Sequence, residues 1–274
     1  MAREKACVAF GSFEFVHRGH VKVAERVKEI AAECDLKSVI FSFPKDGEVY
    51  TTEKEKEYLL KKIGIEEVVT CKEKQDLEQF IIYIKNEFGA QCIVVGENNL
   101  RLTEIRAIAE RERILVDVVE TVSYEGEPVS YDILVKCFEE KNFELLTEIC
   151  GHPYILMGDV VHGKKLGRTV GMPTINLHIY KTKKRPASGV YATRVNLGKE
   201  TYKSATNIGK RPTVDDFDYI TIETFIIDFN RQIYGEICVL EVHKYLREVK
   251  KFDSLEQVQL QVQKDKDQVT VLLS

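Results

Sequence analysis

The segment GSFEFVHRGH, residues 11–20, joins a short apolar run to a stretch of helical periodicity and carries two histidines. Backbone amides at the start of a helix attract anions, and Gly11 lacks a Cβ that would keep a nucleotide away from the backbone. His17 and His20 could donate hydrogen bonds to phosphate oxygens while charge builds on the α-phosphate during nucleotidyl transfer. Two histidines at this spacing are also common on protein surfaces, but their position at a strand-to-helix turn favours the catalytic interpretation.

A second glycine-rich segment, GDVVHGKKLGRTVGMPTINL at residues 158–177, could cover phosphate groups with a flexible backbone that allows close approach. It ends in a hydroxyl and an amide side chain, those of Thr174 and Asn176. No G-x-x-x-x-G-K-[ST] pattern occurs, so a P-loop is excluded as the source of any kinase activity. Glycines at such positions are also common as turn formers, and composition alone leaves both interpretations open.

The elements that must position these residues differ between the two halves of the chain. In the first half, short β-branched runs such as KACVAF, SVIFSF and QCIVVG alternate with segments of helical periodicity. This pattern predicts an α/β fold, an open parallel sheet covered by helices, with ligands bound beyond the carboxyl ends of the strands.

The second half contains several strand-like runs separated by Gly, Asn, Pro and Asp, among them GVYATRVNL, DYITIETFIIDF and EICVLEVHKYL. Only the last segment, from residue 254, has helical periodicity. We therefore predict a small antiparallel β-barrel or sandwich with a C-terminal helix. The change of pattern near Gly151 divides the chain into predicted domains of residues 1–151 and 152–274.

Composition narrows the class of protein. The 274 residues carry a net charge of −4, without a basic excess that would indicate a nucleic-acid partner. No stretch approaches the roughly 18 apolar residues that span a bilayer, so no membrane association and a cytoplasmic location are expected. The seven cysteines are scattered without metal-binding spacing and are expected to be reduced and mostly buried. None of these features carries a signal for oligomeric state.

The second half resembles the riboflavin kinases, whose pattern reads roughly G-x-V-x-x-G-x-x-x-G-R-x-x-G-x-P-T-x-N. The matching residues, in register, are Gly158, Val160, Gly163, Gly167, Arg168, Gly171, Pro173, Thr174 and Asn176. Further matches follow in the same order: GVY at 189–191, NIGKRPT at 207–213, IETFIIDF at 222–229, IYG at 233–235 and LREVKKFDSLEQV at 246–258. The resemblance covers about Pro153 to Ser274. It implies transfer of the γ-phosphoryl group of ATP to riboflavin, which gives FMN.

The same resemblance implies roles for individual residues. Glu223 matches the catalytic glutamate, which would accept the proton of the ribityl hydroxyl. Thr174 and Asn176 would hold Mg²⁺ and the ATP phosphates through oxygen ligands. The residues that would cover the nucleotide are Gly158, Gly163, Gly167, Arg168 and Gly171, and those that would contact the flavin are Arg247 and Phe252. Phe225 and Val249 depart from the family, which often has a histidine and an acid there.

Residues 6–150 resemble the H-x-G-H nucleotidyltransferases, and among them the adenylyltransferase half of bacterial bifunctional riboflavin kinase/FAD synthetases. The opening motif of that family reads G-x-F-D-G-x-H-x-G-H. The chain keeps Gly11, Phe13, His17, Gly19 and His20 of this motif. It has Glu14 and Phe15 in place of the usual aspartate and glycine. The resemblance implies ATP binding near Gly11 and catalysis by His17 and His20.

Later motifs of the adenylyltransferases are less complete. The V-G-x-[DN]-F element appears as VGENN, so Asn98, implied in ATP binding, matches, whereas Asn99 replaces the aromatic residue. The T-F-x-P-H-P stretch appears as SFPKD, and S-S-T-x-I-R appears as SYDILV at residues 130–135. An arginine in the last motif would clamp the triphosphate, and Asp132 adds a negative charge to that segment instead.

Three functions fit the sequence. The first is a bifunctional enzyme that phosphorylates riboflavin and adenylylates FMN to FAD, with riboflavin, FMN and ATP as small-molecule partners. The second is a monofunctional riboflavin kinase with a degenerate first domain. The third is a flavin-binding regulator without catalysis, which the presence of Thr174, Asn176 and Glu223 disfavours.

Overall fold

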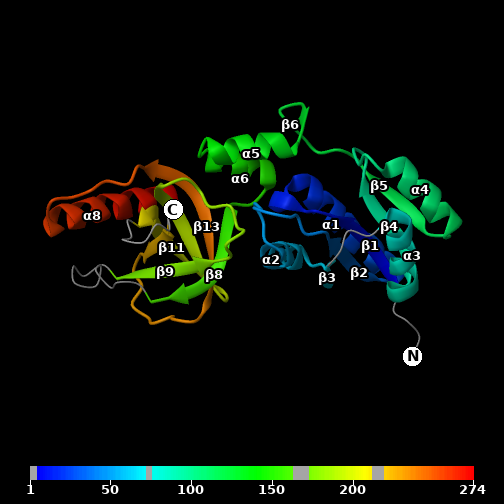
Figure 1. The fold of residues 1–274 in the computed structure, drawn as a ribbon, viewed down its shortest axis with the longest axis horizontal. Helices are drawn as coiled ribbons and strands as arrows, with labels where there is room; N and C mark the ends of the chain where they lie inside the picture. Colours follow the sequence, from blue (N-terminus) through cyan, green and yellow to red (C-terminus); the bar gives the residue numbers. More distant parts are fainter. Residues whose placement is uncertain (1–4, 72–75, 163–172, 212–218) are drawn as a thin grey trace. The chain divides into compact units, whose positions relative to one another are not determined.

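The computed structural model describes residues 5–71, 76–162, 173–211 and 219–274. The chain forms two compact units: residues 1–131 with 149–151, and residues 132–148 with 152–274 (Figure 1). The sequence pattern assigns residues 132–148 to the first domain, whereas their contacts group them with the second unit. No helix in the described ranges is long and apolar enough to cross a membrane.

The first unit is built on the predicted parallel sheet, whose strand order is β3-β2-β1-β4-β5. The strands are β1 (Ala6–Gly11), β2 (Lys37–Ser42), β3 (Glu67–Thr70), β4 (Ala90–Gly96) and β5 (Leu115–Val119). The central strands β1, β2 and β4 are buried because helices cover both faces, which is why they appear in the sequence as continuous apolar runs. β1 lies between β2 and β4, so the segment that follows β1 starts at the carboxyl edge of the sheet, at its central strand.

Among the described residues, the helices that cover this sheet are α1 (Arg18–Cys34), α2 (Glu53–Ile63), α3 (Leu77–Phe88) and α4 (Leu102–Arg111). Local signals fix their ends. Thr52 and Glu55 form a reciprocal capping box at the start of α2, and Gly64 ends that helix in the left-handed conformation. The apolar faces of α3 and α4 share one core with side chains of β1, β2 and β4. α1 also packs on these strands, and a 3-10 turn, η1 (Glu14–Val16), precedes it.

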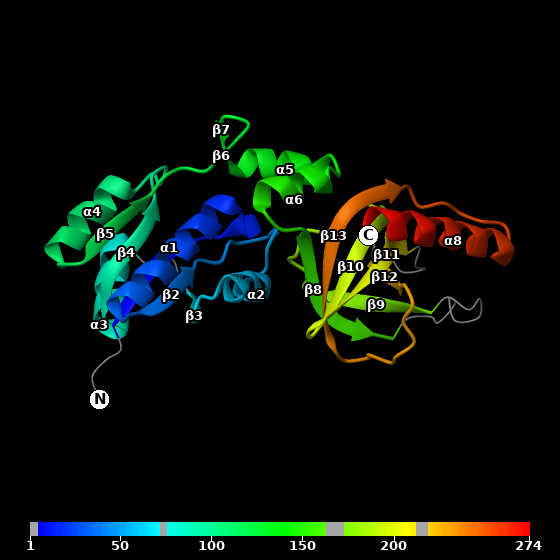
Figure 2. The same ribbon diagram turned by 180° about the vertical axis from the view of Figure 1, so that it is seen from behind.

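A short hairpin, β6 (Ser123–Tyr124) and β7 (Glu127–Pro128), precedes two further helices, α5 (Tyr131–Glu139) and α6 (Phe143–Cys150). Figure 2 shows these two helices as an antiparallel pair. Phe138 and Phe143 pack on Tyr154, with ring centroids 4.9 and 6.1 Å away, and Phe143 also meets Tyr191 at 5.6 Å. These aromatic contacts attach the helix pair to the second unit.

The second unit is a closed antiparallel barrel, as predicted, with strand order β10-β11-β12-β9-β8-β13 and β13 pairing back to β10. The strands are β8 (Tyr154–Val161), β9 (Thr174–Ile179), β10 (Gly189–Leu197), β11 (Glu200–Arg211), β12 (Tyr219–Ile226) and β13 (Ile237–Arg247). The C-terminal helix α8 (Leu255–Leu272) lies beside the barrel (Figure 1). Val269 and Leu273 pack on Ala192 and Ala205, so α8 covers part of the outer face of β10 and β11.

Candidate active sites

The barrel aligns four polar residues in one row across its strands. Asn176 of β9 lies opposite Glu223 of β12, and Glu223 lies opposite Asn207 of β11. The row continues through Val190 of β10 to Arg247 of β13. Neighbouring strands are about 4.8 Å apart, and directly opposed side chains share a face of the sheet. The predicted base and the predicted metal ligand therefore lie next to each other.

Thr174 lies two residues before Asn176 on β9 and so points to the same face. Its partner on β12 is Phe225, where the family often has histidine. Thr174, Asn176 and Glu223 are all half-buried, so the barrel shields their oxygen atoms in part while leaving them accessible. Strand pairing thus brings together the three residues for which the sequence predicts metal and proton-transfer chemistry.

A set of buried hydroxyl groups lies on the opposite, inner face of the same strands. The Oγ1 atom of Thr193 lies 2.7 Å from both the Oγ atom of Ser204 and the Oγ1 atom of Thr206. The Oγ1 atom of Thr206 lies 2.9 Å from that of Thr224, the residue after Glu223. All four residues are buried. These hydrogen bonds inside the barrel fix the mutual register of β10, β11 and β12, and hence the row on the outer face.

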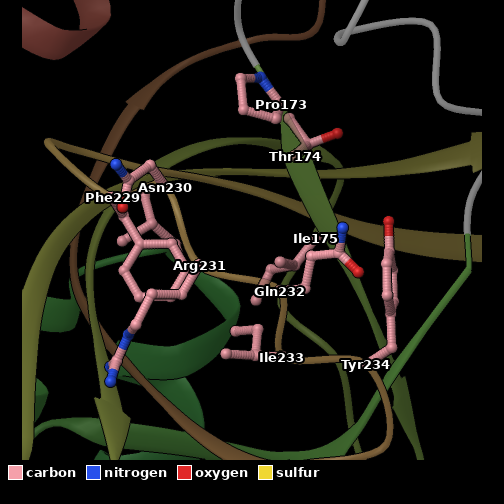
Figure 3. Close-up of a pocket in the computed structure, with 10 residues that line it drawn as sticks. Pro173, Thr174, Ile175, Phe229, Asn230, Arg231, Gln232, Ile233 and Tyr234 are labelled. Atoms are coloured by element: carbon pink, nitrogen blue, oxygen red, sulfur yellow. The ribbon is translucent and has the colours of Figure 1, made fainter.

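A pocket of about 250 Å³ adjoins Thr174 (Figure 3). It lies between the start of β9 and the chain segment 226–234, and its lining residues are Pro173, Thr174, Ile175, Ile226, Phe229, Asn230, Arg231, Gln232, Ile233 and Tyr234. Isoleucine, proline and aromatic side chains form its apolar part, and the amides of Asn230 and Gln232 add hydrogen-bonding groups. Arg231 is held at the rim by Glu200, at 2.6 Å. The pocket combines apolar and amide groups beside the predicted metal ligand.

Arg247, predicted to contact the flavin, is bound to the C-terminal helix. Its Nε and Nη2 atoms donate to the two carboxylate oxygens of Asp265, at 2.9 and 2.6 Å. Asp265 is buried and also accepts a hydrogen bond from Gln261. This bidentate pair joins β13 to α8. Phe252 is half-buried in the connection between these two elements.

The glycines predicted to cover the nucleotide fall in two groups. Gly163, Gly167 and Gly171, together with Arg168, lie outside the described residues. Gly158 lies in β8, and a Cβ atom there would be 2.1 Å from the carbonyl oxygen of His178. The close approach of β9 therefore requires glycine at position 158, whatever its contact with a nucleotide.

No cluster of three His, Cys, Asp or Glu side chains that could hold a metal occurs among the residues that the structure describes. Thr174 and Asn176 offer one hydroxyl and one amide oxygen, the kind of ligand that Mg²⁺ accepts. Mg²⁺ is usually bound by few protein ligands and completed by phosphate and water oxygens. The side chains at the start of β9 therefore fit a metal that arrives with ATP.

In the first unit, the two histidines stack at the start of α1, where β1 ends. Their ring centroids are 3.8 Å apart, and His17 Nδ1 accepts a hydrogen bond from the amide of Gly19 at 3.1 Å. Burial, then the charge of His17, then that of Lys56 lower the pKa of His20 well below its usual range. The Nδ1 atom of His20 is buried, and no described residue forms a hydrogen bond with it. His20 therefore has a ring nitrogen whose hydrogen-bonding capacity none of the described residues satisfies.

A pocket of about 290 Å³ surrounds these histidines at the carboxyl ends of β1, β4 and β5. Gly11, His17, His20 and Asn98 all line it. A Cβ atom on Gly11 would lie 3.5 Å from Phe13, so packing alone does not require glycine there. The structure thus brings together all four residues that the sequence predicts for the adenylyltransferase site, at the edge where parallel sheets bind ligands.

The two replaced residues of the opening motif are buried beside this site. Phe15, which stands where the family has glycine, has φ 61°, and Phe13 and Val16 also have positive φ. Such a backbone favours glycine, and a bulky residue there is strained. Glu14 accepts a hydrogen bond from the Tyr50 amide at 2.8 Å and pairs with the buried Lys56 at 3.2 Å. The turn has therefore kept its glycine-like backbone without the glycine.

Aromatic residues surround Phe15. Its ring stacks on Tyr50 with centroids 4.6 Å apart and meets Tyr131 at 6.0 Å. Lys45, from the SFPKD stretch, lies over the Tyr131 ring at 4.2 Å. Tyr131 belongs to the degraded S-S-T-x-I-R motif. Phe15, Lys45 and Tyr131 therefore form one cluster of aromatic rings and a cation. Each of the three comes from a different segment that departs from the family pattern.

Asn207 and Asp265 are site residues that sequence reasoning missed. Asn207 stands in the NIGKRPT match, but that match assigned it no role. Strand alternation places Asn207 and Gly209 on one face, which is the signal that could have identified it. Asp265 lies in a charged helix, where one acid among many carries no signal until the ion pair with Arg247 is seen.

Two family models match the chain: one described as FAD synthetase over residues 1–132 and one described as riboflavin kinase over residues 150–273. The bifunctional riboflavin kinase/FMN adenylyltransferase of Bacillus subtilis is 27% identical over 288 residues, with 96% of this chain and 91% of the relative covered. That of Haemophilus influenzae is 26% identical, covering 94% and 91%.

A solved structure from Streptococcus pneumoniae, described as a macrolide-efflux protein, is also similar, with a TM-score of 0.79 and 25% identity. It covers 96% of this chain and 93% of that one. Each half is thus matched by its own family model, and the departures in the first half accord with identities below 30%. The chain belongs to the family of bifunctional riboflavin kinase/FMN adenylyltransferases, and its barrel half is a riboflavin kinase that makes FMN from riboflavin and ATP.

Proposed function

We propose that riboflavin is phosphorylated on the outer face of the barrel, at Thr174, Asn176 and Glu223. The observation that carries this proposal is the strand register, in which Glu223 of β12 pairs directly with Asn176 of β9. A base beside a metal ligand is what phosphoryl transfer requires, because the attacking hydroxyl and the γ-phosphate must meet in line.

In the proposed reaction, the Glu223 carboxylate accepts the proton of the ribityl 5′-hydroxyl as its oxygen attacks the γ-phosphorus of ATP. The bond between that phosphorus and the β–γ bridging oxygen breaks, and ADP leaves with the electron pair. Thr174 and Asn176 would hold Mg²⁺, which when bound would supply positive charge to the phosphate oxygens. The protein's own contribution is orientation, because all three side chains project from paired strands rather than from loops.

We further propose that the nucleotide base binds in the pocket beside Thr174. The apolar part of that pocket suits a flat ring, and the amides of Asn230 and Gln232 can hydrogen-bond with its edge. Gly163, Gly167, Arg168 and Gly171 would cover the phosphates, as the resemblance implies. At the other end of the row, Arg247 and Phe252 would contact the flavin ring.

For the first unit we propose FMN adenylylation at Gly11, His17, His20 and Asn98. An FMN phosphate oxygen attacks the α-phosphorus of ATP and pyrophosphate leaves, while His17 and His20 donate hydrogen bonds to the phosphate oxygens. The pocket that all four residues line supports this assignment. The buried Phe15 and the residues of the degraded clamp motif are the features that could weaken ATP binding there.

The test is to incubate the full chain with riboflavin, ATP and Mg²⁺ and to separate FMN and FAD by chromatography. We expect both products. Glu223→Gln should lower the rate of FMN formation by about 10²–10⁴-fold, the usual contribution of a general base, while flavin binding is retained. Glu241→Gln is the matched control, because Glu241 is another half-buried strand glutamate of the same barrel.

Normal turnover in Glu223→Gln would remove Glu223 as the base. FMN without FAD would instead support a first unit that no longer adenylylates. A chelator should stop both reactions, and addition of Mg²⁺ in excess should restore them.

A further inference from the structure

Asn207 occupies the middle of the row, between Glu223 on one side and Val190 on the other. Its Oδ1 atom is buried, and no residue in the described ranges donates a hydrogen bond to it. A buried amide oxygen without a donor is costly, so such an atom in a native protein calls for an explanation. Its position next to the proposed base indicates a ligand-binding role.

Gly209 lies two residues further along β11, on the same face as Asn207. A Cβ atom there would lie 3.8 Å from Asn207 Oδ1 and 3.9 Å from Val249 Cγ2, which are ordinary contacts. The backbone of Gly209 is not left-handed. Within the described part of the chain, neither conformation nor packing requires glycine. Its absent side chain leaves space directly beside the unpaired oxygen.

The spacing of the row relates this space to riboflavin. Asn207 lies one inter-strand spacing from Glu223 and two from Arg247, at about 4.8 Å for each spacing. A flavin with its terminal hydroxyl at Glu223 and its ring toward Arg247 must pass its ribityl chain over Asn207. That chain carries three secondary hydroxyl groups, each a hydrogen-bond donor.

We infer that Asn207 Oδ1 accepts a hydrogen bond from a secondary hydroxyl of the ribityl chain, and that Gly209 leaves room for that chain. This inference rests on the proposed function, because it takes Glu223 as the site of the terminal hydroxyl. It makes Asn207 a specificity-determining residue: a site built to bind a hydroxyl rejects an analogue that lacks it.

The experiment compares two ligands in the full chain with MgADP present, and measures dissociation constants by flavin fluorescence. One ligand is riboflavin, and the other is an isoalloxazine with a 5-hydroxypentyl chain at N10, which keeps the terminal hydroxyl and lacks the secondary ones. We expect the wild type to prefer riboflavin by at least 10-fold. Asn207→Ala should reduce this preference to less than 3-fold by weakening riboflavin alone. Gly209→Ala should weaken both ligands.

Asn196→Ala is the matched control, because Asn196 is a half-buried strand asparagine of the same barrel outside the row. It should keep the preference. Asn207→Ser is the second variant if Asn207→Ala does not fold, and thermal melting reports folding. No preference in the wild type, or an unchanged preference in the Asn207 variant, would overturn the inference.

The Glu223→Gln variant in the turnover assay distinguishes a failure of the proposed kinase site from a failure of the inference about Asn207. If it retains normal FMN formation, the proposed site is wrong. If it is inactive but the preference for riboflavin does not depend on Asn207, the site stands and only the inference fails.

Discussion

The two halves position their phosphate chemistry in different ways. In the barrel, Asn176, Asn207 and Glu223 project from the middle of hydrogen-bonded strands, and a layer of buried hydroxyl groups fixes the register beneath them. In the first unit, His17 and His20 lie at a strand-to-helix turn whose backbone is left-handed at Phe13 and Phe15. Register constrains the kinase site through many weak bonds, whereas a single strained turn supports the adenylyl site. This difference accords with an adenylyl motif that departs from its family pattern and a kinase motif that keeps it.

The largest expected effect is on FAD formation, and it tests whether the strand-to-helix turn of the first unit supports catalysis. His20→Asn should lower FAD formation by about 10²-fold, because it removes a donor to the reacting phosphate, and should leave FMN formation unchanged. Chromatography of both products in one reaction provides the internal control. A parallel fall in FMN would show that the two sites are not independent, and unchanged FAD formation would remove His20 from the adenylyl site.

Two glycines give a matched pair of intermediate effects. Gly158→Ala should destabilise the barrel by about 1–3 kcal/mol, because its Cβ would lie 2.1 Å from a backbone oxygen that cannot move freely. Gly11→Ala meets only Phe13 at 3.5 Å, so the first unit should keep its stability within about 0.5 kcal/mol. Gly11→Ala should instead slow FAD formation, because the proposed adenylyl site brings the nucleotide close to the backbone of Gly11. Thermal melting and product analysis distinguish the two; equal melting temperatures would contradict the reason given for Gly158.

The smallest effect concerns pH. Burial, followed by the charges of His17 and Lys56, lowers the pKa of His20 in the folded chain, while an unfolded histidine titrates near 6.5. The unfolded state therefore binds the proton more readily, and the contribution of neutral His20 to stability is present above about pH 6.5. That contribution falls as the pH drops below this value toward the lower folded pKa. The melting temperature of His20→Asn should depend less on pH than that of the wild type between pH 7.5 and 5.5, and parallel curves would contradict this expectation.

The local pattern of apolar residues was enough to predict the parallel sheet, the antiparallel barrel and the C-terminal helix, because buried parallel strands, half-buried antiparallel strands and helices each have their own pattern. Motif order assigned Thr174, Asn176 and Glu223 to one site, but only strand pairing explains why they meet. The register partner Asn207 and the helix partner Asp265 could not be predicted, since both depend on contacts between residues distant in sequence.

The first unit shows the same limit. The sequence revealed that Phe15 replaces a glycine, but not that the backbone there keeps φ 61°. The sequence also did not predict that Phe138 and Phe143 pack on Tyr154 of the barrel, because an apolar helix face predicts burial but not the element that buries it.

The row on the barrel also restricts where the chain can change length. Strand side chains alternate between faces, so inserting one residue between Ser204 and Thr206 would move every later side chain of β11 to the opposite face. Asn207 would then face the hydroxyl groups inside the barrel, and Thr206 would face outward. An extra residue at the Gly198–Lys199 turn, where β10 reverses into β11, would instead leave both faces as they are. Insertions and deletions compatible with kinase activity should therefore collect in the turns of this barrel, while its strands keep their lengths.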